Sequence, residues 1–272
     1  MKSLATYRRR SLPLIALLFV AWGSSAPAER VPVRHLEGTI HGFLELRSDD
    51  QHVLASGDLV QIAHGDRVTT RTLFRFKDGS IDDETTVFSQ RRNFQLISDH
   101  HIQKGASFPH PIDVLIDCRS SQVTIRSLGK DGKEDEVKTD HLDLPSDLAN
   151  GIVPLIIENI PADSPPTTVS MLVATPKPRI VKLVISSRGE EPFTVVGSSR
   201  KAIHYEIKID LGGIAGVVAP LIGKQPPDIQ AWIIGGEAPT LIREQGPIYP
   251  DGPIMTIELA SPVWPDLAKS GD

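Results

Sequence analysis

The residues best suited to chemistry in this sequence are carboxylates and imidazoles in two neighbouring segments. Residues 82–84 read Asp-Asp-Glu and residues 99–101 read Asp-His-His. If the two segments pair as an antiparallel hairpin, a simple register places Glu84 opposite Asp99 or His100. Such groups bind divalent metals or exchange protons as acid and base. Glu84, Asp99 and His100 are therefore candidate catalytic residues, in a metal-dependent hydrolase.

The alternative is that these side chains are solvated and form cross-strand charge pairs. Their spacing matches no known metal-binding signature. The adjacent residues His100 and His101 point to opposite faces of a strand, so only one of them can join a given site. We expect no bound metal and no cofactor, and the hydrolase remains the second functional hypothesis.

Other motifs give weaker grounds for catalysis. The glycines of 212–216 lack the Lys-Ser/Thr pair of a phosphate-binding loop and its strand–helix context. Residues 198–201 match the Ser-x-x-Lys pattern of a serine-nucleophile motif, but they lie in a predicted strand–turn–strand segment and the partner motifs are missing. A non-enzymatic protein is thus favoured.

The elements that position these residues are predicted to be β-strands. Apolar residues at Ile203, Tyr205, Ile207 and Ile209 alternate with polar ones, as in a half-buried strand. Asp78-Gly79 favours a hairpin turn, because glycine accepts positive φ. We expect a mainly β protein, a curved antiparallel meander (half-barrel or open barrel) with one or two short helices packed on the sheet. Strands are expected over residues 34–47, 53–63, 68–77, 80–90, 93–103, 112–118, 122–128, 167–174, 179–186, 193–198, 201–210, 229–234, 240–244 and 254–259.

A change of hydrophobic period predicts a short helix over 146–158, with Ser146 as its N-cap and Pro154 as a kink. The polar stretch 129–140 is expected to be an exposed hairpin loop that can carry short strand ends. The glycine-rich apolar insert Leu211–Gly223 is a candidate second helix. Gly38 and Gly42 interrupt the first strand, which indicates curvature or close packing.

The N-terminus has the order of a secretory signal peptide. Basic residues at 2 and 8–10 precede an apolar run from Leu12 to Trp22, and Ala26-Pro27-Ala28 is an A-x-A cleavage site. We expect cleavage after Ala28 and a periplasmic or secreted mature chain without a transmembrane segment; an uncleaved anchor is the alternative. One domain is expected over 29–265, followed by a disordered tail over 266–272.

Charge and cysteine content limit the partners. Removal of the signal leaves 25 basic against 34 acidic residues, a net charge of −9, which argues against nucleic acid and anionic membranes as electrostatic partners. The single cysteine, Cys118, cannot form an internal disulfide. We expect it to be a small buried residue, with an intermolecular bridge as the alternative.

The second half of the chain resembles a known group of exported proteins. A strand over 205–210 and a glycine-containing turn precede Trp232-Ile233, then Gly236, Pro239 and a closing strand at 257–259. This order resembles the C-terminal strands of periplasmic half-barrel proteins, which include the LolA/LolB-like lipoprotein carriers. The resemblance implies a curved sheet wrapped around a short helix. It departs at 211–227, and no functional residue transfers.

The leading functional hypothesis is that the concave face binds an apolar or amphipathic ligand, such as a lipid or a lipoprotein-like segment. The predicted lining residues are Phe74, Phe76, Phe94, Leu155 and Trp232, with a core role as the alternative for Trp232. A third hypothesis is an envelope-assembly module that binds a protein partner through a sheet edge.

Overall fold

The computed structural model describes residues 30–128, 135–174, 177–195, 198–212 and 225–260. Within these ranges the chain forms fourteen strands and one helix, α1 (Val153–Glu158), and every strand pair is antiparallel. The strands are β1 (Ile40–Ser48), β2 (Val53–His64), β3 (Arg67–Phe76), β4 (Ile81–Ser89), β5 (Gln95–Lys104), β6 (Ile112–Asp117), β7 (Gln122–Leu128), β8 (Asp135–His141), β9 (Thr167–Val173), β10 (Arg179–Val195), β11 (Ser198–Asp210), β12 (Ile229–Ile234), β13 (Thr240–Gly246) and β14 (Met255–Leu259).

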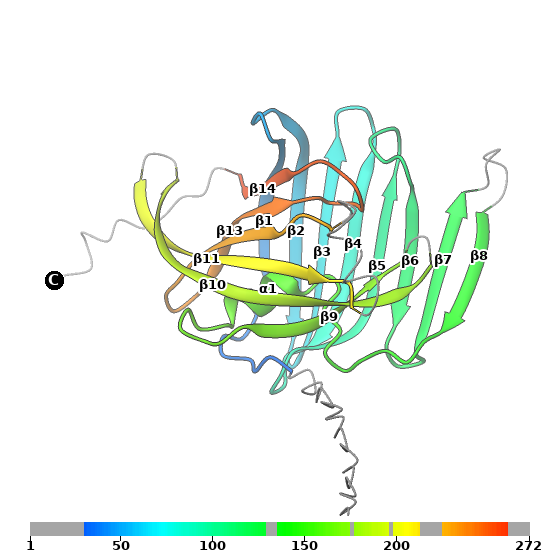
Figure 1. Cartoon of the computed structure of the whole chain (residues 1–272), viewed down its shortest axis with the longest axis horizontal. Helices are drawn as coiled ribbons and strands as arrows, with labels where there is room; N and C mark the ends of the chain where they lie inside the picture. The colour runs from blue at the N-terminus through cyan, green and yellow to red at the C-terminus, as the bar shows by residue number, and fades with distance from the viewer. Residues whose placement is uncertain (1–29, 129–134, 175–176, 196–197, 213–224, 261–272) are drawn as a thin grey trace, which may run out of the picture.

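All fourteen described strands belong to one sheet, in the order β8-β7-β6-β5-β4-β3-β2-β1-β14-β13-β12-β11-β10-β9. The first and last strands, β1 and β14, pair at its centre, while β8 and β9 form its two edges. In Figure 1 the long strands β10 and β11 cross in front of the first half of the sheet near α1, and β2–β7 follow one another from behind α1 toward the right. The mainly β, curved antiparallel fold predicted from the sequence is therefore confirmed.

The largest core cluster joins both halves of the sheet to α1. Ile156 and Ile157 of the helix pack with Phe88 of the first half and with Tyr205 and Ile207 of the second half. The alternation predicted for β11 is confirmed, because Tyr205 and Ile207 are each 1% exposed. The Tyr205 hydroxyl also donates a 2.6 Å hydrogen bond to the carbonyl of Ile160, which fixes the chain just after α1.

Several predicted boundaries were wrong. The predicted strand 179–186 and residues 193–195 of the next one belong to one long strand, β10, because a bulge between Ser187 and Gly189 absorbs the irregularity instead of ending the strand. Residues 196–197 lie outside the described ranges, and Ser198 begins β11. A regular strand, β8, occupies part of the predicted loop 129–140, whose residues 129–134 lie outside the described ranges. The insert Leu211–Gly223 lies almost entirely outside them too. No described helix is long and apolar enough to cross a membrane.

The helix also starts later than predicted. It begins at Val153 with Ile152 as N-cap, so Pro154 lies in the first turn, where its missing N–H costs no hydrogen bond and causes no kink. The residues before it add a short parallel bridge to β9: the amide of Ala149 donates to the carbonyl of Ser170 at 2.8 Å. The side-chain amide of Asn150 bonds both backbone groups of Leu172. This segment therefore occupies the free edge of β9.

Gly151 links that edge segment to α1 and touches the opposite half of the sheet. Its φ is +67°, and a Cβ there would lie 2.0 Å from the Thr86 hydroxyl and 2.9 Å from an Asp99 carboxylate oxygen. Glycine is thus required twice, by the backbone conformation and by the contact. At Gly65, with φ +60°, only the backbone conformation favours glycine, because nothing lies within 4 Å of an added Cβ.

These two glycines provide a test of the contact between α1 and the sheet. We expect Gly65→Ala to lower the free energy of unfolding by about 1 kcal/mol, the cost of a left-handed residue with a Cβ. Gly151→Ala should lower it by about 3 kcal/mol or more, because the clash adds to the same backbone cost. Urea denaturation of both variants measures the difference; equal losses would show that the helix entry is not tightly packed.

Candidate functional site

A cavity of about 790 Å³ lies on the concave side of the sheet. Both halves of the sheet and α1 contribute to its wall. Its apolar wall includes Leu44, Leu59, Phe74, Leu155, Leu241 and Ile257. The most exposed lining residues include Leu36 and Ile40, at 75% and 46%, together with the exposed Glu237 and Ala238. We take these exposed residues to mark the opening of the cavity.

Two glycines of the first segment keep space inside this cavity. A Cβ at Gly38 would meet nothing within 4 Å, and one at Gly42 would meet only Leu59, at 3.9 Å. Of the two interpretations of these glycines, curvature or close packing, close packing is therefore wrong. Close packing occurs instead at Gly57, where a Cβ would lie 2.5 Å from the Phe74 ring. Gly38 and Gly42 contribute volume to the cavity because they carry no side chain.

A cluster of ionisable side chains from β4 and β5 lies in the cavity wall. His101 is the ladder partner of Glu84. Its Nε2 donates a 2.7 Å hydrogen bond to Asp82, and its Nδ1 lies 4.0 Å from Glu84. Burial lowers the pKa of His101, but the carboxylates of Glu84, Asp82 and Asp99 outweigh burial and raise the pKa to about 9. His101 is therefore an imidazolium at neutral pH, with both ring nitrogens as donors.

The partners of the carboxylates in this cluster differ. Asp82 accepts a second hydrogen bond, from the side-chain amide of Gln103 at 2.9 Å. Burial raises the pKa of Glu84, His101 lowers it, and the charges of Asp82 and Glu244 raise it further. The Glu84 side chain keeps 30% of its surface accessible because it lines the cavity, although protein atoms surround it.

Glu244 reaches the same cavity from β13, in the other half of the sheet. Burial raises its pKa to about 7. Among the described residues, no hydrogen bond or ion pair reaches its carboxyl group. Glu84 and Glu244 line the same cavity although they come from opposite halves of the sheet.

Three more acidic groups lie in or next to the cavity wall: Glu158 and Glu37 line it, and Asp99 lies behind the lining residue Gly151. Asp99 is 2% exposed, accepts a 2.7 Å hydrogen bond from Thr86, and has a pKa raised to about 8 by burial and by Glu84. Glu158 of α1 accepts from the amide of Leu241 at 2.7 Å, and burial followed by the charge of Glu37 raises its pKa to about 8. Burial also raises the pKa of Glu37, against a hydrogen bond from Gln61.

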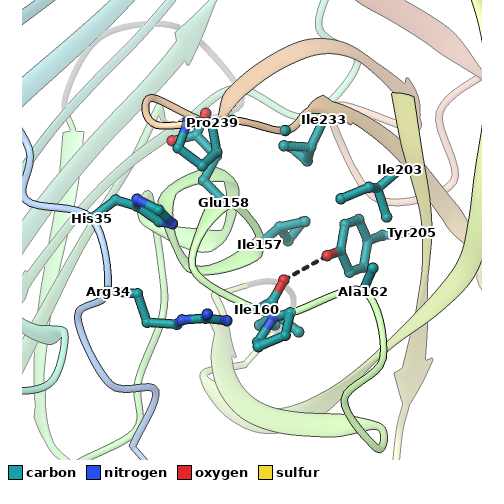
Figure 2. A pocket seen from close by; sticks show the side chains of 13 residues that line it. Arg34, His35, Ile157, Glu158, Ile160, Ala162, Ile203, Tyr205, Ile233 and Pro239 are labelled. Atoms are coloured by element: carbon teal, nitrogen blue, oxygen red, sulfur yellow. Dashed lines mark hydrogen bonds between the residues drawn. The ribbon is translucent and has the colours of Figure 1, made fainter. Parts of the chain in front are cut away.

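A smaller cavity of about 140 Å³ adjoins the large one beside α1. The two share the wall residues Arg34, His35, Glu158 and Pro239. Figure 2 shows Glu158 and Pro239 near one another and the Tyr205 hydroxyl bonded to the Ile160 carbonyl across this space. The backbone amides of Arg34 and His35 each donate to the side-chain oxygen of Asn159 at 2.8 Å, which fixes the N-terminal segment against the end of the helix.

The structure separates the predicted catalytic residues. Glu84 lines the cavity, Asp99 is buried next to Thr86, and the Nε2 atom of His100 is hydrogen-bonded to the carboxylate of Asp113 at 2.9 Å. Because Ser89 pairs with Gln95, a regular ladder would place Glu84 opposite His100; a bulge shifts the partner to His101. In the described ranges, no three His, Cys, Asp or Glu side chains come together to hold a metal ion.

The predicted ligand-binding residues are also divided between roles. Phe74 and Leu155 line the cavity. Phe76 packs edge-on against Phe108 at 5.2 Å, and Phe94 belongs to the main core cluster with Phe88. Trp232 lies in a separate cluster, where its ring stacks on His204 at 4.8 Å and its N–H donates to Glu191. It faces away from its neighbours Ala231 and Ile233, which belong to the main core.

Sequence analysis missed Glu244, Glu158 and the two cavity glycines as site residues. Glu244 was hidden by a bulge between β12 and β13. Trp232 pairs with Arg243 and Ile233 with Leu241, so Ile242 is an extra residue. Leu241 and Glu244 therefore both line the cavity, although their positions differ in parity. The sequence carried no specific signal for Glu244, because it lies between the polar residues Arg243 and Gln245 at the end of a predicted strand.

No family model matches the sequence, and no curated protein matches it. Among solved structures, the chain is similar to a β-barrel-like protein of a domain of unknown function, DUF1849, from Brucella abortus. The alignment covers 88% of this chain and 100% of that chain, with 9% sequence identity and a TM-score of 0.43. Function has to be argued from the cavity itself.

The raised pKa values predict that the protein is more stable in acid than in alkali. Folding raises the pKa of Glu244 to about 7, of Glu158 and Asp99 to about 8, and of His101 to about 9. The folded protein thus binds protons more tightly than the unfolded chain, and this stability is lost as pH rises through those values. We expect the free energy of unfolding, measured in urea, to fall between about pH 5 and about pH 9.

Glu244→Gln should reduce that fall. The variant should be more stable than the wild type by roughly 2 kcal/mol at about pH 9 and equally stable at about pH 4. Glu206→Gln is the control of opposite sign. Burial raises the pKa of Glu206, but Arg188 and Lys208 outweigh burial and lower the pKa. The free energy of unfolding of this variant should therefore not exceed that of the wild type at high pH. A wild-type stability that rises with pH would contradict the electrostatic assignment.

Proposed function

We propose that this protein binds an amphipathic small molecule, with a lipid-like apolar part, in its concave cavity. The observation that carries the proposal is the cavity of about 790 Å³. Ligand sites in proteins occupy about 300–1,000 Å³ and combine apolar walls with a few polar groups. Leu44, Leu59 and Phe74 supply such a wall, and the polar groups of Glu84, His101 and Glu244 interrupt it.

Two features support a cavity that persists in the folded protein. The side-chain-free positions Gly38 and Gly42 leave room that apolar side chains would fill in an ordinary core. The ionisable groups of Glu84 and Glu244 resist collapse, because closing apolar walls over them would remove their remaining contact with water. A volume of this kind is stable when water or a ligand occupies it.

The apolar wall and the opening support a ligand with a hydrocarbon part. Leu36 and Ile40 place exposed apolar surface at the opening, where an acyl chain can make its first contact. The resemblance to LolA/LolB-like carriers implies the same use of a concave sheet face. The binding of a lipid or of a lipoprotein-like segment is the finer form of this proposal.

The contacts favour ligand binding over assembly through a sheet edge. The edge of β9 is occupied by residues 147–150. The other edge, β8, carries the exposed Lys138 next to Asp140, and charges of this kind oppose strand addition. A protein partner in the envelope would therefore need a different surface.

We further propose that the protein acts outside the cytoplasm, after cleavage behind Ala28. The support is the order of basic residues, apolar run and A-x-A site. The mass and N-terminal sequence of the protein isolated from the cell envelope fraction test this proposal: the chain should begin at Glu29. An intact N-terminus on cytosolic protein would contradict it.

Cavity filling tests the binding proposal. Gly42→Leu should place a side chain in the cavity without backbone strain, because a Cβ there meets only Leu59 at 3.9 Å. We expect the affinity for a neutral solvatochromic probe, followed by fluorescence titration of delipidated protein, to fall at least about tenfold. Ser56→Leu introduces the same leucine side chain at an exposed position of β2 and should bind like the wild type. The absence of binding by wild-type protein would refute the proposal.

A further inference from the structure

We infer that the ligand carries a cationic group, which the carboxyls of Glu84 and Glu244 receive while its apolar part lies along the cavity wall. The inference rests on the proposed function and names the chemical class of the ligand. An alkylammonium or guanidinium compound with a hydrocarbon part has this chemistry.

The first support is the charge balance of the cavity wall. Asp82 and Glu84 enter it from β4 and Glu244 from β13, while the only cation that contacts these carboxyls within the described ranges is His101 of β5. Two further acids lie nearby, Asp99 of β5 and Glu158 of α1, but their pKa values of about 8 leave them mostly uncharged at neutral pH. The other basic residues of the wall, Arg34, His35 and His41, come from the segment before and at the start of β1, where the lining residues are exposed.

The second support is the unused hydrogen-bonding capacity of two carboxyls. Asp82 is satisfied by His101 and Gln103. Glu84 has one long ion pair, at 4.0 Å, and in the described part of the chain no hydrogen bond or ion pair reaches the Glu244 carboxyl. Both residues keep some accessible surface in the cavity. A purely apolar ligand that covered them would leave their carboxyls desolvated and unpaired, which is costly. A bound cation would supply the partner that the chain does not.

The third support is that the two carboxyls come from different halves of the sheet. Glu84 lies on β4 and Glu244 on β13, and both line the same cavity as Leu59, Phe74 and Leu155. A cationic group held by both carboxyls therefore leaves the rest of the ligand against this apolar wall. This arrangement fits an organic cation with a hydrocarbon part better than a metal ion, because the described residues gather no set of three ligating side chains.

A chain-matched charge series tests the inference. Full-length mature protein is titrated calorimetrically with decylammonium, decyltrimethylammonium, decanol and decyl sulfate, each below its micelle-forming concentration. We expect both cations to bind at least about tenfold more tightly than decanol, and decyl sulfate to bind more weakly than decanol. A preference for decylammonium over the trimethyl compound would indicate hydrogen bonding in addition to charge.

Two variants separate the carboxyls from the apolar wall. Glu84→Gln combined with Glu244→Gln should reduce the affinity for decylammonium to that for decanol and leave decanol binding unchanged. Asp83→Asn is the matched control, because Asp83 lies on β4 next to Glu84 but pairs outward with Arg71. It should bind all four compounds like the wild type.

Proton release gives an independent readout. Because an ammonium group favours the ionised form of Glu244, decylammonium binding near pH 7 should release protons, and its affinity should increase from about pH 6 to about pH 8. Titration in two buffers of different ionisation enthalpy measures the proton count. Equal or tighter binding of decanol or decyl sulfate, or an unaffected double variant, would overturn the cationic inference alone. If none of the four compounds binds, the proposed function itself fails.

Discussion

The packing of α1 between the two halves of the sheet is the contact on which the architecture depends. Ile156 and Ile157 touch core residues of both halves, and the residues just before the helix are bonded to the edge of β9. A six-residue helix has little stability of its own, so its position is set by this burial. The helix in turn keeps the halves separated, and the space beside it is the cavity. Its own Leu155 and Glu158 contribute to the wall.

The cavity combines two properties that oppose stability, unfilled volume and enclosed carboxyls. Because Gly38 and Gly42 have no side chains, the protein lacks the dispersion energy that side chains packed at these positions would provide. Burial of Glu84 and Glu244 disfavours their ionised forms, which is the cause of their raised pKa values. Structural cores avoid both features, whereas binding sites commonly contain both. Their occurrence in one place distinguishes this region from the satisfied cluster of Asp147, Ser170 and Lys182 at β9.

The strands were predictable from the sequence because their signals are local. The alternation from Ile203 to Ile209 and the turn at Gly79 appear in the structure as a half-buried strand and a positive-φ residue. The site was only partly predictable because it depends on register. One extra residue in β5 makes His101, instead of His100, the ladder partner of Glu84. Another extra residue in β13 places Glu244 on the face of the strand that lines the cavity. A bulge is defined by how one strand pairs with another, so the sequence of either strand alone does not reveal it.

The order of the strands has a consequence for how the chain acquires its structure. Strands β1 to β8 each pair with the next one along the chain, so this half is assembled from hairpins of short sequence separation. Its innermost strand, β1, pairs on one side with β14. Leu44 therefore has its ladder partner there only after Leu259 has been synthesised. The apolar inner surface of the first half is covered by α1, β10 and β11, which follow it in the chain, so this surface stays exposed until those elements have been made. Exposed apolar surface of this kind favours self-association of a nascent polypeptide, and folding of the second half removes it.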